Sequence, residues 1–184
     1  MKKVIFFYLI LNFFSISFAT NKEGIIKNFS KINNLTFNFT QTIDGKDESG
    51  KCIIAYPKKI FCKYNLRYNK VLVSNGNSIA IKSDKNNQYY RYPLKSTPLL
   101  YLLDKTFILK KIENLELLSL NDKYFYFSID QEGQIINLFF DKKSFDLIGW
   151  QTEDIFQNLT VTQIYDVKKN IKLDEKIFIL PEMN

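Results

Sequence analysis

Cys52 and Cys62 are the only cysteines of the chain, and their spacing suits a disulfide across a hairpin. If Ala55 and Lys59 close a short loop around Pro57, the two cysteines face each other on antiparallel strands, within the separation that a disulfide bridges. A zinc site would need more ligands than two thiols, and the sequence contains no histidine. We therefore expect a Cys52–Cys62 disulfide, no metal site and no cofactor.

The residue patterns of common enzymes are missing from the sequence. Without histidine, neither a Ser-His-Asp nor a Cys-His arrangement can form. No glycine-rich phosphate loop is present among six glycines. Catalysis by carboxylates alone stays open, but most acidic residues fall in expected turns, where water solvates them. These are Asp44, Asp47, Glu48, Asp84, Asp122, Glu132 and Asp174. We therefore expect a binding protein and not an enzyme.

Residues 1–19 have the pattern of a secretory signal peptide. Lys2-Lys3 is a basic start, Val4 to Phe14 is apolar and short, and Ser17-Phe18-Ala19 is a small-residue cleavage site. We expect cleavage before Thr20, and a retained membrane anchor is the alternative. Thr20 occupies the place of a lipidated cysteine, so we do not expect a lipoprotein. Export to an oxidising compartment favours the disulfide.

The composition predicts one domain, residues 20–184, with a substantial core, because 46% of the chain is apolar. The formal charge is +7, and removal of Lys2 and Lys3 lowers it by two, to +5. The lysines form no clustered basic stripe, so we expect no nucleic-acid partner. A weak attraction to anionic membrane surfaces stays open.

The stretch from Thr97 to Asp104 predicts a short helix that is apolar on nearly every side. Thr97 can serve as the N-cap and Pro98 suits the first turn. Such a helix must contact apolar surface on more than one face. It could pack in an ordinary core, or it could be a lid over a ligand cavity. Its leucines are Leu99, Leu100, Leu102 and Leu103.

One amphipathic helix and then mostly strands are predicted for the rest of the chain. Thr20 to Glu23 matches a capping box, and apolar residues recur at helical spacing as far as Asn34. From Leu35 to Gln41 the apolar residues alternate, which indicates a strand. Further strands are predicted at Lys51–Tyr56, Ile60–Tyr64, Val71–Ser74, Ser78–Lys82, Gln88–Tyr92, Ile112–Leu120, Tyr124–Asp130, Ile135–Asp141, Phe145–Thr152, Leu159–Asp166 and Lys176–Leu180. This order predicts one long, curling antiparallel sheet of about 11 strands with helices on its concave side.

Several short motifs follow one another along the mature chain. They are Phe39-Thr40-Gln41, Gly50 with Pro57, Leu72-Val73-Ser74-Asn75-Gly76, Thr97-Pro98, and Phe178 with Pro181. With the N-terminal amphipathic helix and the export signal, they resemble the periplasmic outer-membrane lipoprotein carrier family, the LolA-like proteins. The resemblance implies a mainly β fold, an unclosed antiparallel β half-barrel with an α-helical lid over a hydrophobic concavity.

The resemblance also implies a function and its partners. A periplasmic carrier of this family binds the acyl chains of lipoproteins and shuttles them from the inner to the outer membrane. Its partners would be acylated lipoproteins, an inner-membrane lipoprotein-releasing transporter as donor, and an outer-membrane acceptor or the outer membrane itself; we expect a monomer. The implied cavity residues are Leu35, Phe37, Phe39, Ile54, Tyr56, Ile60 and Tyr64, with Cys52 and Cys62 on the same face, and the implied lid residues are Leu99, Leu100, Leu102 and Leu103.

Two positions depart from the family pattern. Tyr56 stands where the family often has an arginine that holds the lid closed by hydrogen bonds. A tyrosine hydroxyl can donate one hydrogen bond but has neither a charge nor a planar fork, so we expect a weaker or different closure. Cys62 stands where the family usually has tryptophan.

The main alternative function is a periplasmic sensor or envelope-assembly domain of the same fold, which binds lipid or a protein without shuttling cargo. An outer-membrane acceptor would need a lipid anchor, which the expected N-terminus does not provide. Extraction of lipoproteins from inner-membrane vesicles distinguishes the carrier from the sensor.

Overall fold

The structure is a computed structural model, and it describes residues 20–65, 70–82, 88–153 and 158–182. The predicted signal peptide, residues 1–19, lies outside the described residues.

Most of the described chain forms eleven strands of one antiparallel sheet. They are β1 (Asn34–Ile43), β2 (Lys46–Ala55), β3 (Lys59–Tyr64), β4 (Val71–Asn75), β5 (Ser78–Lys82), β6 (Tyr89–Pro93), β7 (Leu118–Ser119), β8 (Tyr124–Gln131), β9 (Gln134–Asp141), β10 (Leu147–Glu153) and β11 (Leu159–Lys169).

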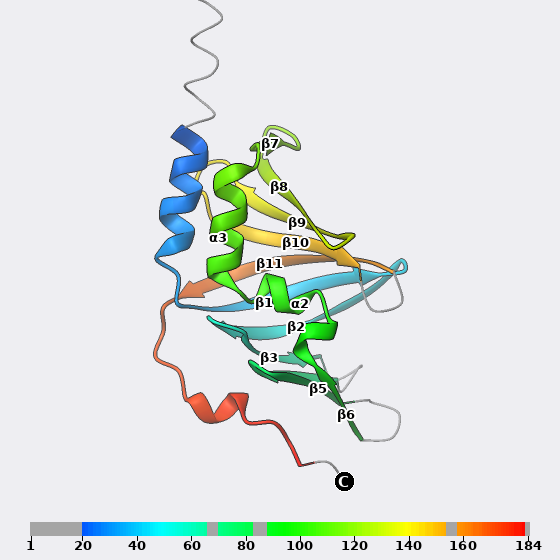
Figure 1. Cartoon of the computed structure of the whole chain (residues 1–184). Coiled ribbons are helices and arrows are strands. Elements are labelled where there is room, and N and C mark those ends of the chain that lie inside the picture. The colour runs from blue at the N-terminus through cyan, green and yellow to red at the C-terminus, as the bar shows by residue number, and fades with distance from the viewer. Residues whose placement is uncertain (1–19, 66–69, 83–87, 154–157, 183–184) are drawn as a thin grey trace, which may run out of the picture.

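The order of strands across the sheet is β6-β5-β4-β3-β2-β1-β11-β10-β9-β8-β7. Strands that follow one another in the sequence are therefore neighbours, except β6 and β7, which are the two edges. Among the described residues, the first and last strands, β1 and β11, also pair. The edge strands β6 and β7 do not pair with each other, and the sheet curls without closing (Figure 1). The prediction of a mainly β, unclosed half-barrel is confirmed.

Helices cover the concave face of this sheet (Figure 1). They are the N-terminal helix (residues 20–30), the 3-10 turn η1 (Leu94–Ser96), α2 (Leu99–Leu102) and α3 (Lys105–Asn114). A second 3-10 turn, η2 (Glu175–Phe178), contacts β3 and β4. It lies on the outer face, because Lys59, which alternates on β3 with the cavity-lining Ile60, contacts Glu175 and the ring of Phe178. None of the helices in the described part of the chain has the length and apolar character of a membrane span.

Two predicted strands were wrong. Most of Ile112–Leu120 is either helix α3 or loop, and only Leu118–Ser119 is a strand. The helix forms because Asp104 is its N-cap, accepting a hydrogen bond from the backbone N–H of Phe107 at 3.0 Å, and because Ile108 and Ile112 bury one face at helical spacing.

Lys176–Leu180 is the other wrong strand. This segment contains part of η2, where the side chain of Asp174 caps the turn by accepting from the backbone N–H of Lys176. The segment docks on the sheet through buried Phe178 and does not pair with it.

Two local predictions also need correction. Thr97 does not cap α2: its hydroxyl donates to the carbonyl oxygen of Leu94 at 2.9 Å, and Pro98 occupies the N-cap position. Asp47 and Glu48 do not lie in the predicted turn: β2 begins at Lys46 and not at Lys51, because the turn needs only Asp44 and Gly45, both with positive φ.

The N-terminal helix and α3 are antiparallel neighbours that cap each other. The ammonium of Lys22 donates to the carbonyl oxygens of Glu113 and Leu115, at 2.7 and 2.8 Å, at the end of α3. The ammonium of Lys105 donates to Ser30 and Ile32, at 3.0 and 2.7 Å, at the end of the N-terminal helix. A cation at a helix C-terminus is favourable and satisfies terminal carbonyls. The two helices are therefore fixed as a pair.

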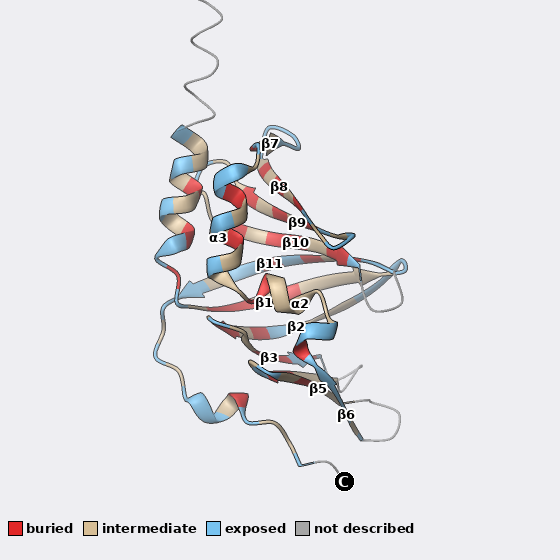
Figure 2. Cartoon of the chain, viewed as in Figure 1, coloured by how far each residue is buried: buried red, intermediate tan, exposed pale blue. Residues whose placement is uncertain are grey.

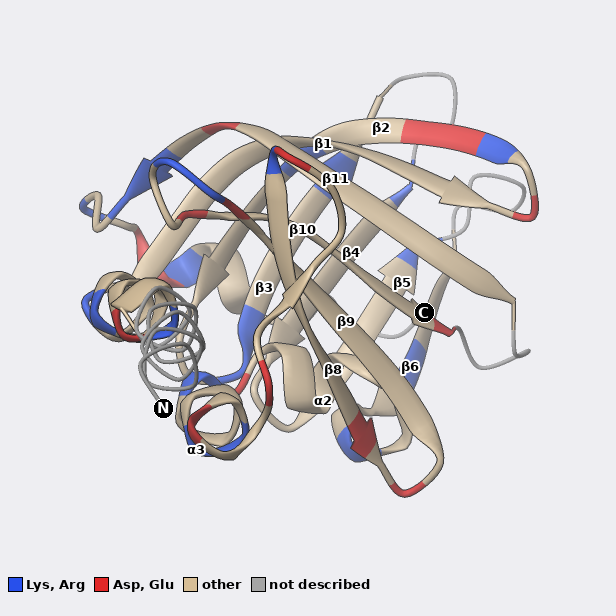
Figure 3. Ribbon diagram, turned by 90° about the horizontal axis from the view of Figure 1, so that it is seen from above, with Lys and Arg blue, Asp and Glu red and all other residues tan. Residues whose placement is uncertain are grey.

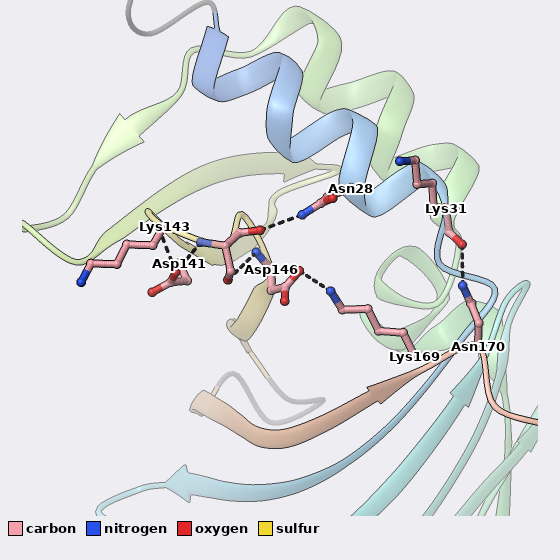
Figure 4. A network of polar contacts seen from close by, with 8 residues as sticks. Asn28, Lys31, Asp141, Lys143, Asp146, Lys169 and Asn170 are labelled. Atoms are coloured by element: carbon pink, nitrogen blue, oxygen red, sulfur yellow. Dashed lines mark hydrogen bonds and ion pairs between the residues drawn. The ribbon is translucent and has the colours of Figure 1, made fainter.

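Polar contacts anchor the N-terminal helix to the sheet (Figure 4). The side chain of Asn28 donates to the carbonyl oxygen of Ser144 in the β9–β10 turn, at 2.7 Å. At the end of the helix, the amide of Asn170 donates to the carbonyl oxygen of Lys31, at 2.9 Å. The helix thus has polar attachments at two points of the sheet.

Buried apolar side chains fill the space between these helices and the sheet (Figure 2). Phe29 contacts the ring of Phe140 on β9 edge-on, with centroids 6.2 Å apart. Leu102, Leu103 and Ile108 are each at most 2% exposed. Full burial of one such side chain contributes roughly 1.5–3 kcal/mol. This part of the concave side is therefore solid core.

Candidate functional site

A cavity of about 360 Å³ lies beside this core, between α2 and the concave face of the sheet. Its volume falls within the range of roughly 300–1,000 Å³ that is usual for small-molecule sites. The apolar wall comes from the sheet, as Phe39, Cys52, Ile60, Cys62, Leu72, Ile79, Ile81 and Trp150. The segment that leads into α2 forms the cover, as Ser96, Thr97, Pro98 and Leu99.

The structure divides the predicted cavity residues into two groups. Phe39, Ile60 and Tyr64 line the cavity. Leu35, Phe37 and Ile54 belong to the hydrophobic core cluster and Tyr56 packs against it, and all four lie outside the cavity lining. Contact of these residues with a lipid stays a prediction.

The predicted lid leucines also divide. Leu99 is half-buried and lines the cavity, whereas Leu102 and Leu103 are buried in the core beneath it. Leu100 is partly buried against the same core. Of the four leucines, Leu99 therefore has the position from which a side chain could contact a ligand.

Sequence reasoning missed several cavity residues on β4, β5 and β10. Leu72 lies directly opposite Cys62, and Ile81 lies opposite Leu72, so the strand register carries the cavity wall from the disulfide toward β6. Alternation within each strand could have placed these residues on the inner face. Trp150 lies on β10, in the half of the sheet beyond β1. The pairing of β1 with β11 and of β11 with β10 brings it to the cavity.

Cys52 and Cys62 are directly opposite each other on β2 and β3 and form the predicted disulfide, with Cα atoms 4.1 Å apart. The disulfide lies in the cavity wall. Its place follows from the turn at Tyr56, Pro57 and Lys58, which sets the register of the two strands.

The hydroxyl of Tyr56 makes no hydrogen bond within the described residues, so it does not attach the lid. Its ring contacts Phe29 edge-on at 5.9 Å, and burial raises the pKa of its hydroxyl. The neighbouring Lys58 makes the attachment: its backbone N–H donates to the carbonyl oxygen of Leu103 at 2.7 Å, and its ammonium lies 3.3 Å from a carboxylate oxygen of Asp104. We call these two contacts the Lys58 latch.

Polar residues gather at the outer end of the cavity, toward the β1–β2 turn. The hydroxyl of Tyr64 donates to Oε1 of Gln41 at 3.1 Å, and Nε2 of Gln41 donates to Oγ1 of Thr162 at 3.0 Å. Burial, and secondly the charge of Glu48, raise the pKa of Tyr64, so this hydroxyl stays protonated as the donor. Lys70 forms an ion pair with Glu48 and lies 4.1 Å from the centre of the Tyr64 ring.

The chemistry that this arrangement supports is apolar binding. Within the described residues, no group of three or more His, Cys, Asp and Glu side chains could hold a metal ion. The cavity offers instead an apolar wall, an edge of hydroxyl and amide groups, and a cover attached to the sheet by few contacts.

Comparison with known proteins found a family model that matches most of the chain. Residues 30–180 match the family model described as outer membrane lipoprotein carrier protein LolA. An uncharacterized conserved protein from Thermus thermophilus has a TM-score of 0.53 at 7% identity, over 89% of this chain and 94% of that one. A LolA superfamily protein from Nitrosomonas europaea has a TM-score of 0.42 at 11% identity, over 87% and 98%. A search of curated proteins found no match.

Proposed function

Because the chain belongs to the outer membrane lipoprotein carrier protein LolA family, we propose that it carries lipoproteins through the periplasm, from the inner to the outer membrane. The observation that supports this most directly is the apolar cavity of about 360 Å³ under α2. Cleavage of residues 1–19, release of cargo by an inner-membrane transporter and delivery to an outer-membrane acceptor or to the outer membrane itself are parts of the proposal.

A soluble carrier must replace the lipid environment of the acyl chains. Each methylene exposed to water costs about 0.8 kcal/mol relative to an apolar site. The cavity wall of aliphatic, aromatic and disulfide groups offers such a site. Since acyl chains carry many methylenes, the cavity must enlarge when cargo enters, and the cover that forms one side of it is the part that has to move.

The contacts of the helices support movement of α2 rather than of the helix pair. The N-terminal helix and α3 cap each other through Lys22 and Lys105, and both bury large side chains. α2 has only four residues, and Leu99 and Leu100 are half-buried. Opening would expose its buried residue, Leu102, at a cost of roughly 1.5–3 kcal/mol. In this mechanism α2 and the segment before it swing away while the helix pair stays on the sheet. A difference of a few kcal/mol between the closed and open states keeps such a step reversible.

The decisive experiment is extraction of cargo from membranes. Mature protein, residues 20–184, is incubated with inner-membrane vesicles that contain a radiolabelled lipoprotein and the lipoprotein-releasing transporter with ATP. A carrier yields a soluble complex with the lipoprotein, which then transfers its cargo to outer-membrane vesicles. Mass spectrometry of ligands that co-purify from the periplasm would identify diacyl or triacyl lipoproteins.

A sensor or assembly domain of the same fold gives a different result. It would bind acylated peptide in solution but leave the lipoprotein in the vesicles, and this outcome would contradict the carrier function. A chain that binds no acyl compound in either assay would contradict both functions.

A further inference from the structure

The cavity is not apolar throughout, and its polarity changes along the strands. On β1, Phe39 lies deeper and Gln41 lies nearer the β1–β2 turn. On β10, Trp150 lies deeper and Thr152 lies nearer the end of the strand. On both strands the lining therefore passes from an aromatic ring to a hydrogen-bonding group. Ile43, two residues beyond Gln41 and opposite Thr160, adds an apolar side chain at the same end.

Three threonines, Thr152, Thr160 and Thr162, form the polar edge of the cavity, and we call them the threonine shelf. Gln41 and Thr162 are directly opposite on β1 and β11, and Thr160 and Thr152 are directly opposite on β11 and β10. Thr152 is 8% exposed, Thr160 6% and Thr162 2%, so the three threonines face the cavity and not bulk water. Adjacent strands thus place three buried hydroxyls side by side.

The hydroxyls of the shelf are only partly used by the protein. Thr162 accepts a hydrogen bond from Gln41, but no acceptor for its own hydrogen occurs in the described part of the chain. The hydroxyl of Thr160 donates to the carbonyl oxygen of Asn158 at 3.4 Å, which is long for such a bond. The hydroxyl of Thr152 makes no hydrogen bond to any described residue. Valine would fill the same space without an unsatisfied polar group, so the hydroxyls suit a ligand that hydrogen-bonds.

The charges near the shelf do not suit an anionic head. Lys70, the cation that lines the cavity, is already paired with Glu48. Glu153 also lines the cavity and has no ion-pair partner within the described ranges. Figure 3 shows the acidic positions of β2 at the hairpin end of that strand. A carboxylate or phosphate head would meet no free cation among the described lining residues and at least one carboxylate.

We propose that the threonine shelf is a head-group site that selects an uncharged ester or glycerol head, with the acyl chain directed past Phe39 and Trp150 toward α2. Ester carbonyls and glycerol hydroxyls can accept from Thr152 and Thr162, and glycerol hydroxyls can also donate to their oxygens. This inference rests on the proposed function, because it assigns the orientation and the chemical class of an acyl ligand in the same cavity.

The test compares two ligands with the same acyl chain, 1-monolauroylglycerol and laurate, at concentrations below micelle formation. Each displaces the uncharged fluorescent probe N-phenyl-1-naphthylamine from the mature protein. We expect monolauroylglycerol to bind about tenfold more tightly than laurate at pH 7.5. Thr152→Val and Thr162→Val should each weaken monolauroylglycerol binding about five- to tenfold, the scale of a lost hydrogen bond, and leave the probe and laurate nearly unchanged.

The control variant is Thr40→Val, a threonine of β1 that lies outside the cavity lining. It should bind both ligands as the wild type does, and far-UV circular dichroism and thermal unfolding should show that all three variants fold. If the probe binds but the two ligands bind equally, or the shelf variants keep the preference, the head-group site is wrong while the acyl cavity stands. If no apolar probe binds to the wild type, the proposed function fails, and the head-group site fails with it.

Discussion

The backbone N–H of Lys58 donates to the carbonyl oxygen of Leu103 across 2.7 Å, joining the β2–β3 turn to the end of α2. The same lysine reaches Asp104 with its ammonium, at 3.3 Å. Asp104 in turn caps α3 by accepting from the backbone N–H of Phe107 at 3.0 Å. One turn of the sheet thus holds the junction between the helix that we propose to move and the helix that stays.

Breaking the ionic part of the Lys58 latch should ease opening. Lys58→Met removes the charge and keeps the backbone hydrogen bond, and Asp104→Asn removes the charge but keeps a good N-cap. The side chains are 38% and 25% exposed, so each change should lower the free energy of unfolding by less than about 1 kcal/mol. Stopped-flow fluorescence should show faster entry of N-phenyl-1-naphthylamine into both variants.

The double variant is the control for this interpretation. If the two side chains act through one contact, Lys58→Met with Asp104→Asn should open no faster than either single variant. Entry rates identical to that of the wild type in all three would show that the ion pair does not hold the cover.

The sequence predicts the sheet well, because strands and hairpins are marked by residues that are near each other in the chain. Alternation of apolar residues marks each long strand, and Asn75-Gly76 marks a hairpin, so β1 to β6 and β8 to β11 were expected close to their observed places. The disulfide follows from two positions around one turn. These features need only residues that are near each other in the chain.

The features that the sequence did not predict depend on contacts between residues that are distant in the chain. The stretch Ile112–Leu120 has apolar residues that suit a strand, but the Asp104 cap and the core under α3 make its first part helical. The threonine shelf was not predicted, because Gln41 and Thr162 meet only through the pairing of the first and last strands. The family pattern points to Tyr56 as the lid contact, whereas Lys58 makes that contact partly through its backbone, which side-chain chemistry does not reveal.

A charge at Leu99 should block the cavity. Leu99 is half-buried and lines the cavity, so the carboxylate of Leu99→Glu would lie against its apolar wall and disfavour an acyl chain. We expect binding of N-phenyl-1-naphthylamine to weaken at least about tenfold, with little loss of stability, because Leu99 is only partly buried and packs at the border of the core. Fluorescence titration measures the affinity.

The matched control for this change is Leu120→Glu, at a leucine that is 55% exposed and outside the cavity lining. It should bind the probe as the wild type does. Leu102 is unsuitable for the test, because it is 2% exposed and a charge there would disrupt the core. Normal probe binding by Leu99→Glu would mean that α2 does not cover the binding site.

The disulfide should contribute to stability more than to binding. It links residues ten apart in the chain, and a cross-link of this kind stabilises typically by about 2–4 kcal/mol. The double variant Cys52→Ala, Cys62→Ala should lose stability on this scale in urea unfolding, yet still bind the apolar probe, because β2 and β3 remain paired on both sides of the lost link. A reductant should destabilise the wild type and leave the double variant unchanged. Equal stability of the two proteins under oxidising conditions would contradict a structural role for the bond.

The β9–β10 turn should make stability depend on acid through Asp141. Two backbone N–H groups donate to the carboxylate of Asp141, that of Ser144 at 2.7 Å and that of Lys143 at 2.9 Å. Both lower the pKa of Asp141, and the hydrogen bond from Ser144 has the larger effect. Since the folded pKa lies below the unfolded one, the stabilisation is fully present above the unfolded pKa and is lost as the pH falls through the folded pKa. Asp141→Asn should therefore have a lower thermal midpoint than the wild type at pH 7, and the difference should shrink below about pH 4.

Asp122→Asn, at an exposed carboxylate without a hydrogen bond in the described chain, should show no such trend. Because Ser144 also accepts from Asn28, hydrogen exchange of the N-terminal helix should rise in Asp141→Asn; a constant difference in midpoint at all pH values would refute the role of the charged carboxylate.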